Sequence, residues 1–225
     1  MQTCEFLTPL TCRYLVAVPE DLPPKPVIVL TLHGYGANAE TMLRLTVPTV
    51  GAAVIVASLQ APNQHYTGDG PTSGIAAYNW GIRHHHEDAV RLHQQMVLQT
   101  LGDLQSRFGV TASECFLMAF SQAVGLNYRF LGTHPHAVAG VVAICGGVPK
   151  DWESPKYEDF STPILHIARS EDEFFPVMTA DGFADRLRVH ASDVEFHMIA
   201  GMHRYPSKAR DLVRPWMARV LSAME

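Results

Sequence analysis

The feature that most constrains this chain is a series of short apolar runs without the in–out alternation of a half-exposed strand. "PVIVLTL" within 26–34, "AAVIVASLQ" at 52–60 and "AVAGVVAIC" at 137–145 are apolar almost throughout and rich in β-branched residues. Such runs are typical of parallel strands that are buried on both faces of a sheet. Further strands are expected at 13–19, 114–120, 163–168 and 193–199.

Helical segments are predicted between these strands. The alternation predicts an α/β fold with a mainly parallel central sheet and helices on both faces, after an antiparallel start. No gap is large enough for a separate cap, so one domain over residues 1–225 is expected. The irregular segment 61–83 is long enough to be functional. The helices are expected at 38–48, 84–107, 122–133, 176–190 and 207–223.

Composition and charge exclude several classes of function. The chain has 225 residues, a net charge of −5 and scattered basic residues, which gives no footprint for nucleic acid. No apolar run approaches the ~18 residues of a membrane span, and the N-terminus lacks a signal-peptide pattern. The four cysteines have no Cys-x-x-Cys spacing, so free thiols and a cytoplasmic location are expected.

A serine follows the predicted strand at 114–120. In "MAFSQAV", strand and helix meet within two residues at Ser121, a turn that exposes Oγ and places the next backbone N–H at a helix N-terminus. This resembles a G-x-S-x-G nucleophile elbow with alanine in place of both glycines. A helix-capping serine explains the same letters, so the motif alone does not decide.

Two later strand ends supply the other groups that acyl transfer needs. Asp172 follows the strand at 163–168 and can orient an imidazole, while His203 follows the last strand and can act as a general base. Upstream, "HGYG" follows the strand at 26–34, where the N–H of Tyr35 can stabilise an oxyanion. Taken alone, Asp172 is better explained as an acidic loop residue and His203 as a surface histidine. Their joint occurrence at strand ends, in the order Ser, Asp, His, favours catalysis.

With these residues in place, the chain resembles the phospholipase/carboxylesterase family of α/β-hydrolases from about residue 26 to the end. "LHGYGAN", "LQAPN…YNWG", "FSQA", "AICGGVP", "EDEFFPV" and "AGMHRYP" are similar to its motifs. The resemblance implies a Ser121–Asp172–His203 triad and an oxyanion hole formed by the N–H groups of Tyr35 and Gln122. Two departures stand out: Ala119 and Ala123 replace the elbow glycines, and Ala168-Arg169 replace a common His-Gly.

The function expected is hydrolysis of short to medium carboxylic esters through an acyl-enzyme. No cofactor or metal is needed, and the partners expected are a small ester substrate and a second copy in a homodimer, with no nucleic acid and no membrane insertion. A thioesterase or lysophospholipase is the nearest alternative, and a non-catalytic ligand-binding homologue a more remote one. The substrate pocket is expected to include His33, Trp80, Phe174 and Met202.

Other constellations are weaker. In "RHHHEDAVRLH", successive helical residues point about 100° apart, and His86 and His93 lie roughly 10 Å apart, so these side chains cannot share a metal ion. "GDGPTSG" lacks the lysine of a phosphate-binding loop. The aromatic residues Tyr66, Tyr78 and Trp80 could line a pocket or pack the long loop onto the body.

Overall fold

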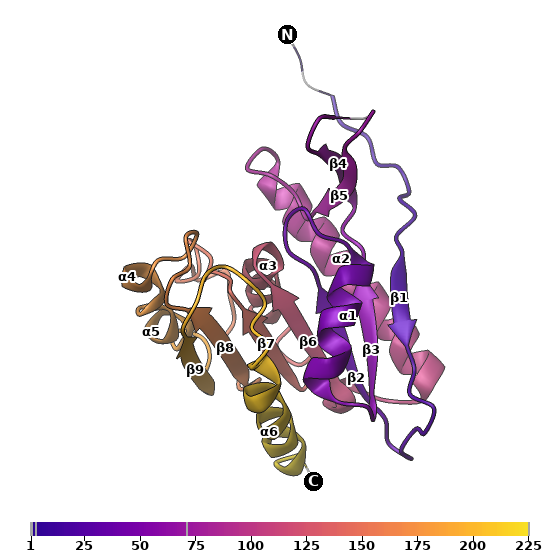
Figure 1. Cartoon of the computed structure of the whole chain (residues 1–225), viewed down its shortest axis with the longest axis vertical. Helices are drawn as coiled ribbons and strands as arrows, with labels where there is room; N and C mark the ends of the chain where they lie inside the picture. Colours follow the sequence, from indigo (N-terminus) through magenta and orange to yellow (C-terminus); the bar gives the residue numbers. More distant parts are fainter. Residues whose placement is uncertain (1, 3, 71, 225) are drawn as a thin grey trace.

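The computed structural model describes residues 2, 4–70 and 72–224, and within them it contains a seven-stranded sheet in the order β1-β3-β2-β6-β7-β8-β9. Strands β2 to β9 in this sheet are parallel, and β1 alone is antiparallel, paired with β3. Figure 1 shows the twisted sheet with helices packed against it. The sheet strands are β1 (Tyr14–Ala17), β2 (Val27–Leu32), β3 (Val54–Leu59), β6 (Cys115–Phe120), β7 (Gly140–Ile144), β8 (Ile164–Arg169) and β9 (Val194–Ile199).

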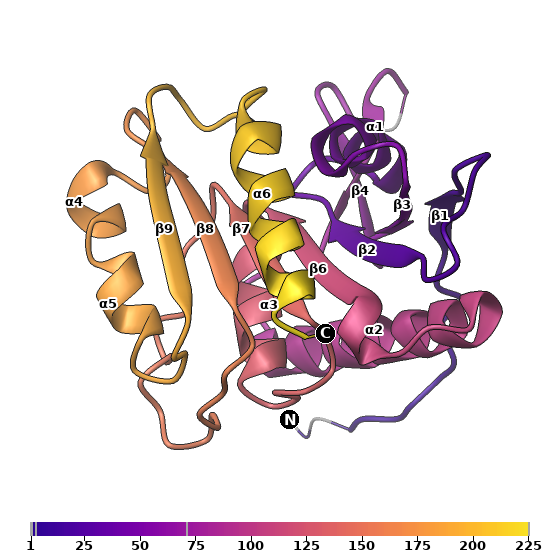
Figure 2. The ribbon, with the colours of Figure 1, turned by 90° about the horizontal axis from the view of Figure 1, so that it is seen from below.

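The helices cover both faces of the sheet. One core lies under α1 and α6, and the other lies under α2, α3 and α5; Figure 2 shows α6 and α1 on the face opposite α2. The fold class predicted from the sequence is therefore confirmed. The helices are α1 (Ala39–Val50), α2 (His86–Phe108), α3 (Gln122–Leu131), α4 (Val177–Ala180), α5 (Phe183–Leu187) and α6 (Ala209–Ser222), with a 3-10 turn at Ala112–Glu114.

Two local predictions were wrong, and a third holds only in part. The segment 61–83 contains an antiparallel hairpin, β4 (Asn63–Thr67) and β5 (Ile75–Asn79); β4 is polar and mostly exposed, and the short β5 buries only Ala77 and Asn79, so neither gives a strand pattern. Residue 71 lies outside the described residues. The helix expected at 176–190 is interrupted at Asp181–Gly182, which leaves the short helices α4 and α5. The antiparallel start involves β1 alone, since β2 runs parallel to β3.

Three histidines are buried in the body of the protein. Burial lowers the pKa of His33 from 6.5 to about 4 and the pKa values of His93 and His166 to about 3. Each ring is therefore neutral in the folded protein at neutral pH, whereas an unfolded histidine takes up a proton near pH 6.5.

These depressed pKa values predict acid-labile stability. Below about pH 6.5 the unfolded chain binds more protons than the folded one. The free energy of unfolding should therefore decrease as the pH is lowered, by up to about 1.4 kcal/mol per pH unit for each histidine. Denaturant unfolding at about pH 7 and about pH 5, above the range in which most carboxylates titrate, measures the effect. A His93→Leu variant should show a shallower slope. Equal stability of the wild-type protein at both pH values would contradict the prediction.

Candidate active site

Ser121 forms the whole connection between β6 and α3. Its backbone has φ 56° and ψ −115°, a combination that L-residues seldom adopt and that costs of order 1–3 kcal/mol. The turn is held from the neighbouring strand, because Ser121 N donates to the carbonyl of Ile144 at 2.9 Å. Strain that the surrounding structure imposes on a serine is a common property of functional turns.

The alanines that replace the elbow glycines are part of the core. Ala119 lies in β6 between Leu32 and Ala143 of the adjacent strands, and both Ala119 and Ala123 are fully buried. Their methyl groups therefore fill space between the sheet and α3, and Ser121 keeps its positive φ in their presence.

Ser121, His203 and Asp172 are joined in one row of hydrogen bonds. Ser121 Oγ lies 2.8 Å from His203 Nε2, and His203 Nδ1 lies 2.8 Å from Asp172 Oδ2. The side chains of His203 and Asp172 are only 9% and 1% exposed. Because Asp172 accepts at Nδ1, the neutral imidazole carries its proton there and leaves Nε2 free to accept the serine proton.

The loop after β8 holds the Asp172 carboxylate in place. Its second oxygen, Oδ1, accepts the backbone N–H groups of Phe174 and Phe175, both at 2.9 Å. The neighbouring Glu173 side chain accepts the backbone N–H of His203 at 3.1 Å, so a side chain of the acid loop also holds the main chain of the histidine loop. Sequence analysis did not find these donors, because any residue type can supply a backbone N–H.

The histidine loop is fixed from its other side by Tyr205. The Tyr205 hydroxyl donates to Thr49 Oγ1 of α1 at 3.0 Å, and its ring packs near Phe120 at the end of β6. Before the histidine, Gly201 has φ +127° and the guanidinium of Arg169 lies directly against it. A side chain at Gly201 would collide with Arg169. The arginine that stands in place of the common glycine before the acid loop is therefore accommodated because residue 201 has no side chain.

The turn after β2 lies against the elbow. A Cβ atom on Gly34 would be 3.0 Å from Ser121 Cβ and from the Phe120 ring, so the close approach requires glycine. Neither Tyr35 N nor Gln122 N finds an acceptor within the described residues. Two free N–H groups, one beside Ser121 and one in the turn packed on it, are suited to bind a developing oxyanion.

His33 lies behind this turn, not in an open pocket. Its ring is buried, with Nδ1 bonded to the carbonyl of Gly34 at 2.8 Å, and Nε2 accepting from Ala61 N at 3.1 Å and from the Gln60 amide at 3.0 Å. The ring therefore holds the turn in place from below, and a substrate could reach it only by displacing these bonds.

The Gln122 side chain ties the elbow to the loop after β5. Its Oε1 accepts the backbone N–H of Trp80 at 3.1 Å, and its Nε2 donates to the Gly81 carbonyl at 2.8 Å. The buried Trp80 indole in turn donates to the His33 carbonyl at 2.7 Å. Gln122 is thus placed to offer its backbone N–H to a substrate while its amide side chain orders the loop.

Replacing the Gln122 amide should loosen this loop. In Gln122→Leu, Trp80 N and Gly81 O lose their partners, which should cost about 1–3 kcal/mol of stability and lower ester turnover. Gln122→Glu keeps an acceptor for Trp80 N and should be intermediate. Thermal unfolding together with ester hydrolysis measures both effects, and a Leu variant as stable and active as the wild type would show that the amide is dispensable.

A groove of about 860 Å³ begins beside Gln122 and runs along α3. Trp80 and Ile82 line one wall, and Leu126 and Arg129 of α3 line another. Two predicted pocket residues lie outside this groove. Phe174 is 67% exposed, with its ring centre 4.8 Å from that of His203, and Met202 is exposed and precedes His203 in the chain. Their contact with a substrate stays a prediction.

The described residues contain no group of three or more His, Cys, Asp or Glu side chains arranged to hold a metal ion. In the histidine-rich segment, His84 and His85 are exposed, His86 lines the groove, and His93 is buried edge-on to Trp80. No helix in the described part of the chain is both long and apolar enough to cross a membrane.

The sheet order, its helical layers and the strand-end location of the polar residues define an α/β-hydrolase fold. Solved structures agree: the carboxylesterase from Mesorhizobium loti superimposes with a TM-score of 0.74 at 17% identity, covering 95% of this chain and 98% of that one. The Bacillus cereus carboxylesterase gives 0.70 at 17%, covering 93% and 94%. Acyl-protein thioesterase 2 of Zea mays gives 0.69 at 15%, covering 93% and 99%. No curated protein matches the sequence.

The family model of the phospholipase/carboxylesterase hydrolases matches residues 13–216. The chain belongs to the phospholipase/carboxylesterase family, which confirms the resemblance found in the sequence.

Proposed function

We propose that the protein is a serine esterase that cleaves short to medium carboxylic esters through an acyl-enzyme. The observation that carries this proposal is the hydrogen-bonded row from Ser121 Oγ through His203 to Asp172. Family membership supports a hydrolase of the esterase or thioesterase kind, and the row supplies the groups that such chemistry needs.

In the proposed mechanism, Ser121 Oγ attacks the ester carbonyl while His203 Nε2 takes the hydroxyl proton. Asp172 holds the imidazole in the required tautomer and stabilises its charged form. The negative charge on the carbonyl oxygen is bound by Tyr35 N and Gln122 N. His203 then protonates the leaving alcohol, the acyl group remains on Ser121, and the same imidazole activates water to release the acid.

The groove along α3 supports the choice of substrate. It is open to solvent, and the apolar side chains of Trp80, Ile82 and Leu126 line it together with charged residues of α2, of α3 and of positions 150–151. An acyl chain of modest length can therefore lie against these apolar side chains. The same openness places little restriction on the leaving group, so acyl thioesters and lysophospholipids are the substrates to compare.

The test combines covalent labelling with a substrate panel. A fluorophosphonate probe should label the wild-type protein and leave Ser121→Ala unlabelled. Turnover of a nitrophenyl butyrate should exceed that of the matched butyryl thioester and of lysophosphatidylcholine. Faster cleavage of the thioester or lysophospholipid would reassign the substrate, while a wild-type protein that is neither labelled nor active on any of them would favour a non-catalytic binding role.

A further inference from the structure

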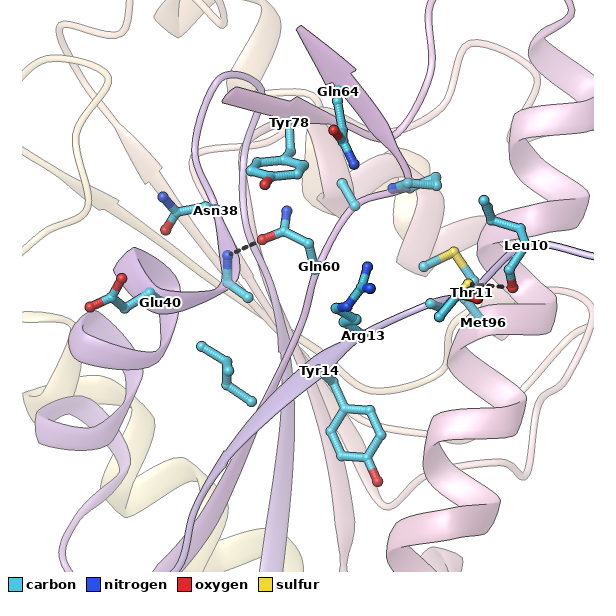
Figure 3. Close-up of a pocket in the computed structure, with 15 residues that line it drawn as sticks. Leu10, Thr11, Arg13, Tyr14, Asn38, Glu40, Gln60, Gln64, Tyr78 and Met96 are labelled. Carbon is cyan, nitrogen blue, oxygen red and sulfur yellow. Dashed lines mark hydrogen bonds between the residues drawn. The ribbon is translucent and has the colours of Figure 1, made fainter. Parts of the chain in front are cut away.

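A second cavity lies between the N-terminal segment and the body of the protein. Its volume is about 320 Å³, within the range of small-ligand sites, and it shares no lining residue with the groove along α3. Residues 10–15 form one side, the start of α1 forms another, and residues 60–64 with Tyr78 close it (Figure 3).

Hydrogen-bond donors converge on this cavity. Figure 3 shows the polar ends of Arg13, Gln60 and Gln64 turned into one space, with Tyr78 beside them. The Arg13 side chain is exposed and its guanidinium has neither an ion-pair partner nor a hydrogen bond within the described residues, while its main chain is held because its carbonyl accepts Gln60 N at 2.9 Å. The Gln60 amide uses one N–H for His33 and keeps its second N–H free.

The charges around the cavity favour an anion. Its acidic lining residue, Glu40, pairs with Arg44 at 3.3 Å and points away from Arg13 in Figure 3. The N-terminus of the twelve-residue helix α1, at Ala39, adds a positive dipole end. The Tyr14 hydroxyl donates to the carboxylate of Asp103, which does not line the cavity. Arg13 is the basic side chain among the lining residues, and no acidic group is paired with it within the described residues.

The rest of the lining is apolar. Leu10, Ala61, Pro62 and Met96 supply a surface suited to a short hydrocarbon chain. A planar guanidinium pairs best with a carboxylate, through two parallel hydrogen bonds. We propose that this cavity is a second binding site, which takes a short-chain aliphatic carboxylate with its charge on Arg13 and its chain against Met96.

The occupant would contact the groups that hold the oxyanion turn. Gln60 bonds both to His33 below the turn and to Ala39 N at the start of α1, at 3.1 Å. The Tyr78 backbone bonds both Gly36 and Ala37 of the turn. Such a carboxylate is the acid product of the proposed esterase. If the protein has that proposed function, the product binds at this site and changes the rate of turnover by restraining or shifting the turn.

Calorimetric titration of the whole protein with hexanoate, compared with neutral hexanamide, tests the site. Hexanoate should bind saturably, and hexanamide about ten-fold more weakly or not at all. Arg13→Gln should weaken hexanoate binding about ten-fold, whereas Arg188→Gln, which removes an exposed arginine paired with Asp185, should leave it unchanged. Gln64→Leu, at an exposed position, should weaken it about three-fold and serves as a second variant.

The proposal is overturned if hexanoate does not bind, if hexanamide binds equally well, or if both Arg13→Gln and Gln64→Leu bind hexanoate like the wild type. Binding of hexanoate in the groove along α3 would leave the affinity of both variants unchanged, because neither Arg13 nor Gln64 lines that groove. The titration does not need catalysis, so a failure of the proposed esterase activity would leave this result interpretable.

Discussion

Ser121→Ala is expected to lower kcat/KM for a short-chain nitrophenyl ester by about 10⁴-fold or more, because it removes the atom that we propose attacks the carbonyl. The variant keeps the backbone that Ile144 holds, so it should fold, and circular dichroism with thermal unfolding checks this. Steady-state hydrolysis and single-turnover labelling measure the loss.

The matched control for this prediction is Ser207→Ala. Ser207 is exposed, follows the histidine loop and makes no side-chain hydrogen bond within the described residues, so its variant should retain wild-type activity. If Ser121→Ala keeps more than about a tenth of wild-type turnover while remaining folded, Ser121 is not the nucleophile.

Asp172→Asn should lower turnover by about 10³–10⁴-fold at neutral pH while leaving the fold intact. The asparagine oxygen can still accept the N–H groups of Phe174 and Phe175, but its amide nitrogen then faces His203 Nδ1 as a donor. The imidazole must therefore carry its proton on Nε2, which prevents it from taking the proton of Ser121. The loss should appear mainly in kcat.

A control for this effect lies one residue away. Glu171 is exposed and makes no side-chain bond in the described structure, so Glu171→Gln removes the same charge without touching the imidazole and should be nearly neutral. Equal losses in the two variants would mean that local negative charge, not the orientation of His203, is what Asp172 contributes.

The central sheet could be predicted from the sequence because its strands are buried on both faces and therefore apolar throughout. The residues of β4 and β5 are mostly exposed, so these strands lack the continuous apolar pattern that burial requires. The helix predicted at 176–190 is divided by the single turn at Asp181–Gly182. Local patterns thus identified the elements that tertiary burial dominates and missed those that hydrogen bonding and turn geometry decide.

The candidate site was predictable to the extent that its chemistry resides in residue types at strand ends. Ser121, Asp172 and His203 follow β6, β8 and β9, and parallel strands bring those ends to one edge. The anchoring bonds were not predictable: Tyr205 reaches Thr49 across 156 positions, and His33 proved to be a support of the turn. The carboxylate cavity likewise joins residues as far apart as Leu10 and Met96.

The two bonds of the Gln122 amide also bear on local opening of the native state. They make the loop at Trp80 and the first turn of α3 parts of one cooperative unit, because neither can move away without breaking both bonds. Fluctuations of the β4–β5 hairpin, which ends at Asn79, can therefore reach Gln122 N through this one side chain, whereas they reach the turn of Tyr35 directly through the backbone bonds of Tyr78. We therefore expect the amide hydrogen of Trp80 to exchange with solvent as slowly as the amide hydrogens of α3, and more slowly than those of the β4–β5 hairpin that precedes it.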